Sequence, residues 1–149
     1  LLLLGHRFRE RGVRAAADIP DNLPRVMGSE SRLKQLFVNL LANAADAAGG
    51  NVHIAAAPCE NGQYLEAVVE DDGPGIPDDV RKQMFNPFFT TKAGRLNTGL
   101  GLAICQQIID APNGLLLVER RGGRTVFSLR FPVCRNMPER GGAQRGGAC

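Results

Sequence analysis

Two adjacent carboxylates, Asp71 and Asp72, end a hydrophobic run in the stretch "VEDDGPGIPDD" (69–79), and two glycines follow closely. Val68 and Val69 have the pattern of a buried strand, so Asp71 is expected at its inner end. An ionised carboxylate there is costly unless it is hydrogen-bonded. It can accept a hydrogen bond from an exocyclic amine such as adenine N6, while the glycines keep the neighbouring wall thin enough for a flat ring. The alternative is a solvated turn, because Asp-Gly and Pro-Gly favour turns.

Polar side chains form a narrow seam along the segment "SRLKQLFVNLLANAADAA" (31–48). At about 100° per residue, five of them fall within a stripe roughly 80° wide, and apolar side chains occupy most of the remaining circumference. The five are Arg32, Gln35, Asn39, Asn43 and Asp46. A surface helix normally shows the reverse, a narrower apolar stripe and a broad polar face. The seam either faces water or faces a polar ligand, and amide oxygens one turn apart suit a Mg²⁺ ion that already carries phosphate oxygens.

Glycines precede a third segment, "TGLGLAICQQII" (98–109), where a helix is expected to begin. Free backbone N–H groups and the helix dipole make such a start an anion site, and Gly99 and Gly101 would let a phosphate approach the backbone. A simple turn is the alternative. The chain has no GxxxxGK[ST] run and no GxGxxG directly after a strand, so a phosphate would be bound by another scheme. Thr125, at the start of the last predicted strand, could add a hydroxyl to the carboxylate site through water.

The elements that must position these residues are predicted from periodicity and from Gly and Pro punctuation. Helices are predicted at 1–11, 29–48, 77–84 and 101–110, and strands at 13–19, 51–58, 64–71, 115–121 and 125–133. Hairpins combined with long helices predict an α+β fold, a two-layer sandwich in which helices cover one face of a mixed, mostly antiparallel sheet. Residues 86–99 are predicted to form a loop, and 134–149 a Gly- and Arg-rich tail without packing.

Length, net charge and cysteine content limit the class of protein to which the chain can belong. A chain of 149 residues is expected to form one domain. The net charge of +3 is mild and concentrated in the tail, which excludes a dedicated nucleic-acid binder with a basic face. The four cysteines have no metal-type spacing and are predicted to be reduced thiols. The apolar run at 1–4 is far too short to span a bilayer.

The order of five motifs, Asn39/Asn43, "DDGPG", "FNPFFTTK", "GLGL" and "GGRTVF", resembles the ATP-binding domain of sensor histidine kinases. That family belongs to the superfamily of gyrase, heat-shock chaperone, histidine kinase and mismatch-repair ATPases. The resemblance runs from about 13 to 132, and it is strongest with the branch of nitrogen-regulation and dicarboxylate-transport sensors. It implies the Bergerat ATP-binding fold over 13–133, and it makes 1–12 the end of a linker helix from a dimerisation and phosphoacceptor domain.

The resemblance also implies roles for individual residues. Asn43 and Asn39 would ligate Mg²⁺, and Asp71 would read adenine N6 within the box that contains Gly73, Gly75 and Ile76. Phenylalanines 85, 88 and 89 would anchor a lid at 90–98, in which Lys92 or Arg95 would touch the γ-phosphate. The phosphates would be held at the second glycine box. The full set of predicted ATP-binding residues is Asn39, Asn43, Asp46, Asp71, Gly73, Gly75, Ile76, Phe85, Lys92, Arg95, Gly99, Leu100, Gly101, Leu102 and Thr125.

Three features depart from the family pattern. Many of these kinases have a lysine or arginine where Asp46 stands, so the phosphate charge must be met elsewhere. Arg124 replaces the second glycine of the third glycine box. No phosphoacceptor motif is present, because His6 has no following acidic residue and His53 lies in a predicted strand; both are interpreted as structural or solvent-facing.

The function implied is binding of Mg-ATP and transfer of its γ-phosphate to a histidine on a separate dimerisation domain. No residue of this chain is securely catalytic, so little turnover is expected from it alone. The implied partners are that domain and, indirectly, a response regulator. The parent protein would be a homodimeric inner-membrane sensor of a bacterium, with this domain in the cytoplasm. The alternatives are a superfamily ATPase that drives conformational change, a nucleotide-binding module without catalysis, and RNA binding by "RGGAQRGG".

Overall fold

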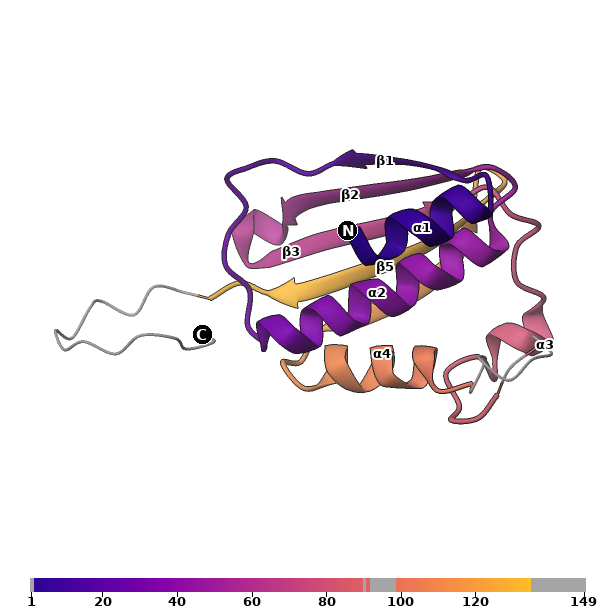
Figure 1. Ribbon diagram of the computed structural model, residues 1–149. Coiled ribbons are helices and arrows are strands. Elements are labelled where there is room, and N and C mark those ends of the chain that lie inside the picture. Colours follow the sequence, from indigo (N-terminus) through magenta and orange to yellow (C-terminus); the bar gives the residue numbers. More distant parts are fainter. Residues whose placement is uncertain (1, 90, 92–98, 135–149) are drawn as a thin grey trace, which may run out of the picture.

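The computed structural model describes residues 2–89, 91 and 99–134, which form helices and strands (Figure 1). The helices are α1 (Leu2–Glu10), α2 (Glu30–Ala47), α3 (Asp78–Arg81) and α4 (Gly101–Asp110), with a 3₁₀ turn η1 (Glu60–Gly62). The strands are β1 (Arg14–Asp18), β2 (Asn51–Cys59), β3 (Tyr64–Asp71), β4 (Leu115–Arg121) and β5 (Arg124–Pro132). These bounds agree closely with the segments predicted from the sequence.

The strands form one sheet in the order β1-β2-β3-β5-β4. β1 runs parallel to β2, and the other neighbouring pairs are antiparallel. Figure 1 shows α1, α2 and α4 on one face of this sheet. The predicted α+β sandwich with a mixed, mostly antiparallel sheet is therefore confirmed.

Strand alternation decides which side chains face the helices. Along β3, every second residue from Leu65 to Asp71 is buried, because successive side chains of a strand point to opposite faces. Asp71 is the last of this buried row, and it pairs with Thr125 of β5, which is also buried. The register therefore carries a carboxylate and a hydroxyl into the layer between sheet and helices, at one end of the core.

The core lies between the sheet and α2. The buried side chains of α2 are Leu36, Leu40, Leu41, Ala44 and Ala45. Val38 is exposed, so α2 is less completely buried than its apolar composition predicts. α4 adds Cys105, Ile108 and Ile109 beside it. Of the polar seam of α2, Asn39 contacts the start of α4 and Asp46 contacts α1.

Two terminal features differ from the sequence-based expectations. α1 is packed into the domain, because Leu4 and Phe8 belong to the same buried cluster as the side chains of α2. Cys59 and Cys105 are free thiols, whereas Cys134 is in a disulfide bond, so the prediction of four reduced cysteines is wrong at that residue. Among the described residues, no helix is both long and apolar enough to cross a membrane.

Candidate functional site

A pocket of about 810 Å³ opens where the polar seam of α2, the end of β3 and the start of α4 meet. It collects residues from segments that are far apart in the sequence. Nine of the predicted ATP-binding residues line it: Asn39, Asn43, Asp71, Gly75, Ile76, Gly99, Gly101, Leu102 and Thr125. Apolar side chains of Val80, Met84, Phe89 and Phe127 complete the wall, as a flat ring requires.

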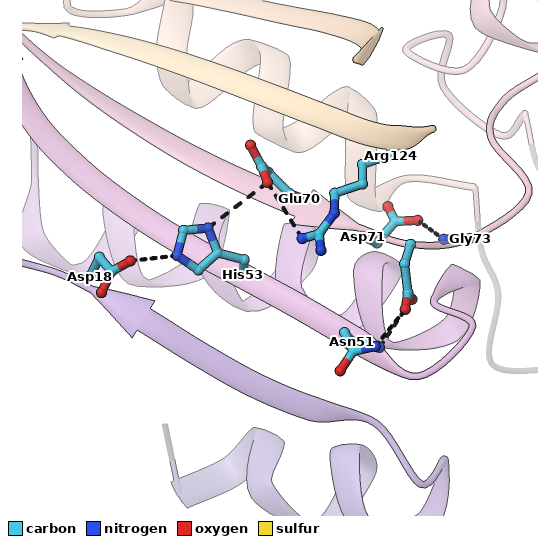
Figure 2. A network of polar contacts seen from close by, with 8 residues as sticks. Asp18, Asn51, His53, Glu70, Asp71, Gly73 and Arg124 are labelled. Atoms are coloured by element: carbon cyan, nitrogen blue, oxygen red, sulfur yellow. Dashed lines mark hydrogen bonds and ion pairs between the residues drawn. The ribbon is translucent and has the colours of Figure 1, made fainter. Parts of the chain in front are cut away.

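Asp71 is the buried carboxylate of this pocket, with 2% of its surface exposed. Burial raises its pKa, while hydrogen bonds donated by the Gly73 amide (3.0 Å) and the Thr125 hydroxyl act in the opposite direction. Figure 2 shows the carboxylate turned toward Gly73. These contacts fix the orientation of the group, and a carboxylate held in this way can accept a hydrogen bond from an amine in the pocket.

The neighbouring Asp72 has a different partner set and a different task. It accepts hydrogen bonds from the backbone amides of Asn51 and Gly50 (both 3.0 Å) and from the Asn51 side chain (2.7 Å). These hydrogen bonds lower the pKa of Asp72 to about 2, and the bond from the backbone amide of Asn51 has the largest effect. Asp72 therefore ties the "DDGPG" loop to the start of β2, which the sequence analysis did not anticipate.

The two glycines of the loop allow close approaches. A Cβ atom on Gly73 would lie 2.2 Å from the carbonyl oxygen of Ala47, so only glycine lets the loop meet the end of α2. Gly75 has φ of 89°, and the guanidinium of Arg120 lies directly against its Cα position. The thin wall that the sequence predicts next to Asp71 is therefore required by the packing of the loop.

The asparagines of α2 face the pocket one turn apart. Nδ2 of Asn39 donates to the carbonyl oxygen of Gly101 (3.3 Å), which joins α2 to the first residue of α4. This contact occupies the amide nitrogen, and the side-chain oxygen is the atom of Asn39 that suits a cation. Asn43 lines the pocket with the same chemistry. Two carboxamide oxygens beside the start of a helix fit a Mg²⁺ ion that receives its other ligands from phosphates and water.

The start of α4 offers the predicted anion site. In the described part of the chain no side chain caps this helix, and Gly101 and Leu102 of its first turn line the pocket. Gly99 has φ of 67°, and a Cβ atom there would lie 2.5 Å from the backbone of Phe88. The glycine box is thus packed against the phenylalanine segment, and the free backbone N–H groups at such a helix start are suited to an anionic ligand.

The remaining predicted residues have other positions. Gly73, Phe85 and Leu100 lie next to the pocket-lining residues, and Phe85 packs against the core. Asp46 is held in ion pairs with Arg7 of α1 and with Arg11 of the turn that follows α1. Lys92, Arg95 and all of the predicted lid except Thr91 lie outside the described residues. Arg7 and Arg11 line the pocket and were missed, although their spacing of four residues places both on one face of the predicted first helix.

Arg124 and His53 belong to the opposite face of the sheet. Nε2 of His53 lies 2.8 Å from Asp18, and its Nδ1 and the Arg124 guanidinium lie 3.9 Å and 3.7 Å from Glu70 (Figure 2). Gly122 and Gly123, with φ of 56° and 82°, form the turn before β5. Arg124 in the third glycine box therefore leaves the pocket unobstructed, and His53 is a structural residue as interpreted.

Comparison with known proteins finds one matching family model and several similar sensor proteins. A family model described as histidine kinase-, DNA gyrase B-, and HSP90-like ATPase matches residues 28–135. The sensory histidine kinase/phosphatase NtrB of Rhodobacter capsulatus is 42% identical over 130 residues, which cover 78% of this chain and 36% of the relative. The C4-dicarboxylate transport sensor protein DctB of Rhizobium meliloti is 36% identical over 135 residues, which cover 88% of this chain and 21% of the relative.

A solved structure is similar to this chain over most of its length. The nucleotide-free catalytic domain of the histidine kinase ThkA superposes with a TM-score of 0.76 at 30% identity, covering 89% of this chain and 86% of that one. The chain thus belongs to the family of histidine kinase-, DNA gyrase B- and HSP90-like ATPases. Within this family it is the ATP-binding catalytic domain of a sensor histidine kinase of two-component signalling, and the predicted branch is confirmed. The chain spans about a third or less of the length of these two curated relatives.

Proposed function

We propose that the pocket binds Mg-ATP and presents its γ-phosphate to a histidine on a separate dimerisation domain. The observation that carries the proposal is the buried Asp71, held by Gly73 and Thr125 at one end of a pocket whose other wall contains Asn39, Asn43 and the start of α4. This order of groups matches a ligand with an amine-bearing ring at one end and anionic oxygens at the other.

The adenine would be recognised at Asp71. Its carboxylate accepts the exocyclic N6 amine, and the Thr125 hydroxyl restrains the carboxylate and any water beside it. Ile76, Met84 and Phe127 supply the apolar surfaces for the ring. An analogue without the exocyclic amine would deprive the buried Asp71 carboxylate of one hydrogen-bond donor, although Gly73 and Thr125 still donate to it, and this loss gives the site its selectivity for adenine.

The phosphates would lie between α2 and α4. The first-turn amides of α4 bind phosphate oxygens, and Asn39 and Asn43 direct their side-chain oxygens at the same region. Mg²⁺, when bound there, neutralises charge that develops on the phosphate oxygens during transfer. Phosphoryl transfer depends mainly on positioning and on electrostatics, and these residues are suited to both.

The nucleophile would come from another domain. His6 lines the pocket wall but pairs with Glu10 at 3.2 Å, and His53 is bound on the far face of the sheet. Asn39 occupies the place where the superfamily ATPases have a water-activating glutamate, and an amide is a poor base. The chain alone is therefore expected to bind ATP and to turn it over very slowly, while a dimerisation domain added in trans becomes phosphorylated.

The wider assignments follow from the same proposal. Residues 1–12 would be the end of a linker helix, 13–133 the catalytic domain and 134–149 a tail. The parent protein would be a homodimeric, membrane-anchored bacterial sensor whose dimerisation domain passes the phosphoryl group to a response regulator. This domain would work on the cytoplasmic side and bind no nucleic acid.

The test is a titration of the purified chain with a fluorescent ATP analogue, with and without Mg²⁺. Asp71→Asn is expected to abolish binding, and Asn43→Ala to remove its Mg²⁺ dependence. Asp79→Asn, an exposed carboxylate that does not line the pocket, is the matched control and should bind as wild type does. Binding that ignores the Asp71 change would refute the proposed pocket. Incubation with labelled ATP, with His6→Gln as a second control, shows whether the chain labels itself.

A further inference from the structure

The charges on the pocket wall are unevenly distributed. Among the described residues that line the pocket, the only lysine or arginine side chains are Arg7, on α1, and Arg11, in the turn that follows α1. Asp71 stands at the adenine end, and Glu10 stands on the α1 side, paired with His6. In the described part of the wall, a polyphosphate can therefore meet a permanent cation only at α1 and the turn after it.

Helix α1 is docked firmly enough to hold these arginines in place. Leu4 and Phe8 are buried in the same core cluster as the apolar side chains of α2. Arg11 lies in the turn after α1, and its backbone N–H donates to the carbonyl oxygen of Arg7 (3.1 Å), so the chain there continues the path of the helix. Both arginines line the pocket, four residues apart. Arg9 is on the same helix but is exposed and does not line the pocket.

Asp46 determines where the guanidinium groups sit. Its side chain is only 5% exposed, and Arg7 binds both of its oxygens, with Nε at 3.1 Å and Nη2 at 2.6 Å. Such a two-point pair between a guanidinium and a carboxylate is geometrically specific. Nη2 of Arg11 lies 3.4 Å from the same carboxylate, and the Arg11 side chain is 58% exposed. Arg7 is therefore fixed, whereas Arg11 keeps donors for a ligand.

The position of Asp46 along α2 places the cluster Asp46–Arg7–Arg11 near the phosphate end of the pocket. Asp46 follows Asn43 by three residues, which places it on the same face of the helix, about one turn further on. Asn43 and Arg11 line one pocket. A ligand whose phosphates reach the asparagine of α2 would have the guanidinium groups beside those phosphates.

We propose that α1 and the turn after it form part of the nucleotide site, with Arg11 contacting the phosphate oxygens of a nucleoside di- or triphosphate and Arg7, locked on Asp46, as a positioning residue. This inference rests on the proposed function of the pocket. Asp46 stands where many kinases of the family have a lysine or arginine. The inference is that the ion-paired cluster Asp46–Arg7–Arg11 supplies the positive charge beside the phosphates that such a basic residue would supply. It also makes nucleotide affinity depend on the docking of α1.

The test is isothermal titration of the full chain with adenosine, AMP, ADP and ATP, comparing wild type with Arg11→Gln, Arg11→Lys and Arg9→Gln. Arg11→Gln should weaken ATP and ADP binding about tenfold and leave adenosine binding unchanged, because only the phosphate contact is lost. Arg11→Lys should restore part of that affinity, and Arg9→Gln should match wild type. A higher salt concentration should reduce the difference in ATP affinity between wild type and Arg11→Gln, because salt screens the contact between the guanidinium and the phosphate.

Arg7→Gln and Asp46→Asn test the positioning role. Both should weaken ATP binding more than adenosine binding. Urea unfolding of each variant measures how much stability is lost with the buried ion pair, and adenosine binding serves as the control for that loss. The inference is overturned if Arg11→Gln affects ATP no more than Arg9→Gln does, or if it weakens adenosine to the same extent as ATP. A wild-type chain that binds ATP in either of these cases keeps its proposed function. A wild-type chain that binds none of the four ligands overturns both.

Discussion

Asp71 and Asp72 are adjacent carboxylates with opposite environments. Burial raises the pKa of Asp71, which faces the pocket, whereas hydrogen bonds from Asn51 and Gly50 lower the pKa of Asp72 to about 2. The strand alternation that ends at Asp71 is the cause, since the next residue must leave the core face. One aspartate thereby serves recognition, and its neighbour holds the loop that carries it.

At the residue scale, Asp72 gives a prediction on pH. Its folded pKa lies below the ordinary value of 3.8, so its contribution to stability is present above pH 4 and is lost as the pH falls toward 2. The difference in free energy of unfolding between wild type and Asp72→Ala should shrink over that range. Urea unfolding at a series of pH values measures it, with Asp79→Ala as the control. A difference that stays constant down to pH 2 would contradict the assigned role.

At the element scale, α1 and β1 show how composition can mislead about packing. β1 has the expected alternation, yet all five of its residues are exposed, because it is an edge strand paired only with β2. α1, which is predicted to be the end of a linker, buries Leu4 and Phe8 in the domain. A short amphipathic helix is stable only where its apolar stripe finds a partner, and here α2 and the core provide it.

The docking of α1 can be tested through Phe8. Phe8→Ala should lower the free energy of unfolding by about 3 kcal/mol, because a buried ring is replaced by a cavity. Leu117→Ala on β4, where the side chain is 49% exposed, is the matched control and should change it by no more than about 0.5 kcal/mol. Denaturant unfolding gives both values. If the two variants were equally stable, α1 would not be part of the folded domain.

At the scale of the whole molecule, the pocket joins α1, α2, β3, α4 and β5, so a ligand bound there should stabilise the entire domain. ATP with Mg²⁺ at about 100 times its Kd should raise the free energy of unfolding by about 2.7 kcal/mol. Thermal unfolding with increasing nucleotide measures this, and Asp71→Asn should show almost no shift. A shift of equal size in that variant would mean that the nucleotide binds elsewhere.

The sequence by itself determined the local elements and most of the site. Periods of 2 and 3.6 residues, with Gly and Pro punctuation, identified the five strands and α1, α2 and α4 within one residue, because side-chain direction follows from backbone geometry alone. The predicted helix at 77–84 is shorter, because α3 ends at Arg81. The same rule placed Asp71 at the end of a buried row and Asn39 with Asn43 on one helix face. The motif order was sufficient to indicate the family, which the relatives then confirmed.

Only the tertiary structure decided what depends on contacts between distant residues. The strand order, with β5 inserted between β3 and β4, places Thr125 beside Asp71, and no local pattern encodes that neighbour. The pair between Arg7 and Asp46 joins residues 39 apart, through the docking of one helix on another. Such contacts arise from burial summed over the whole core, so a charge that looks solvated in the sequence, like Arg11, becomes part of the pocket wall only when the chain has folded.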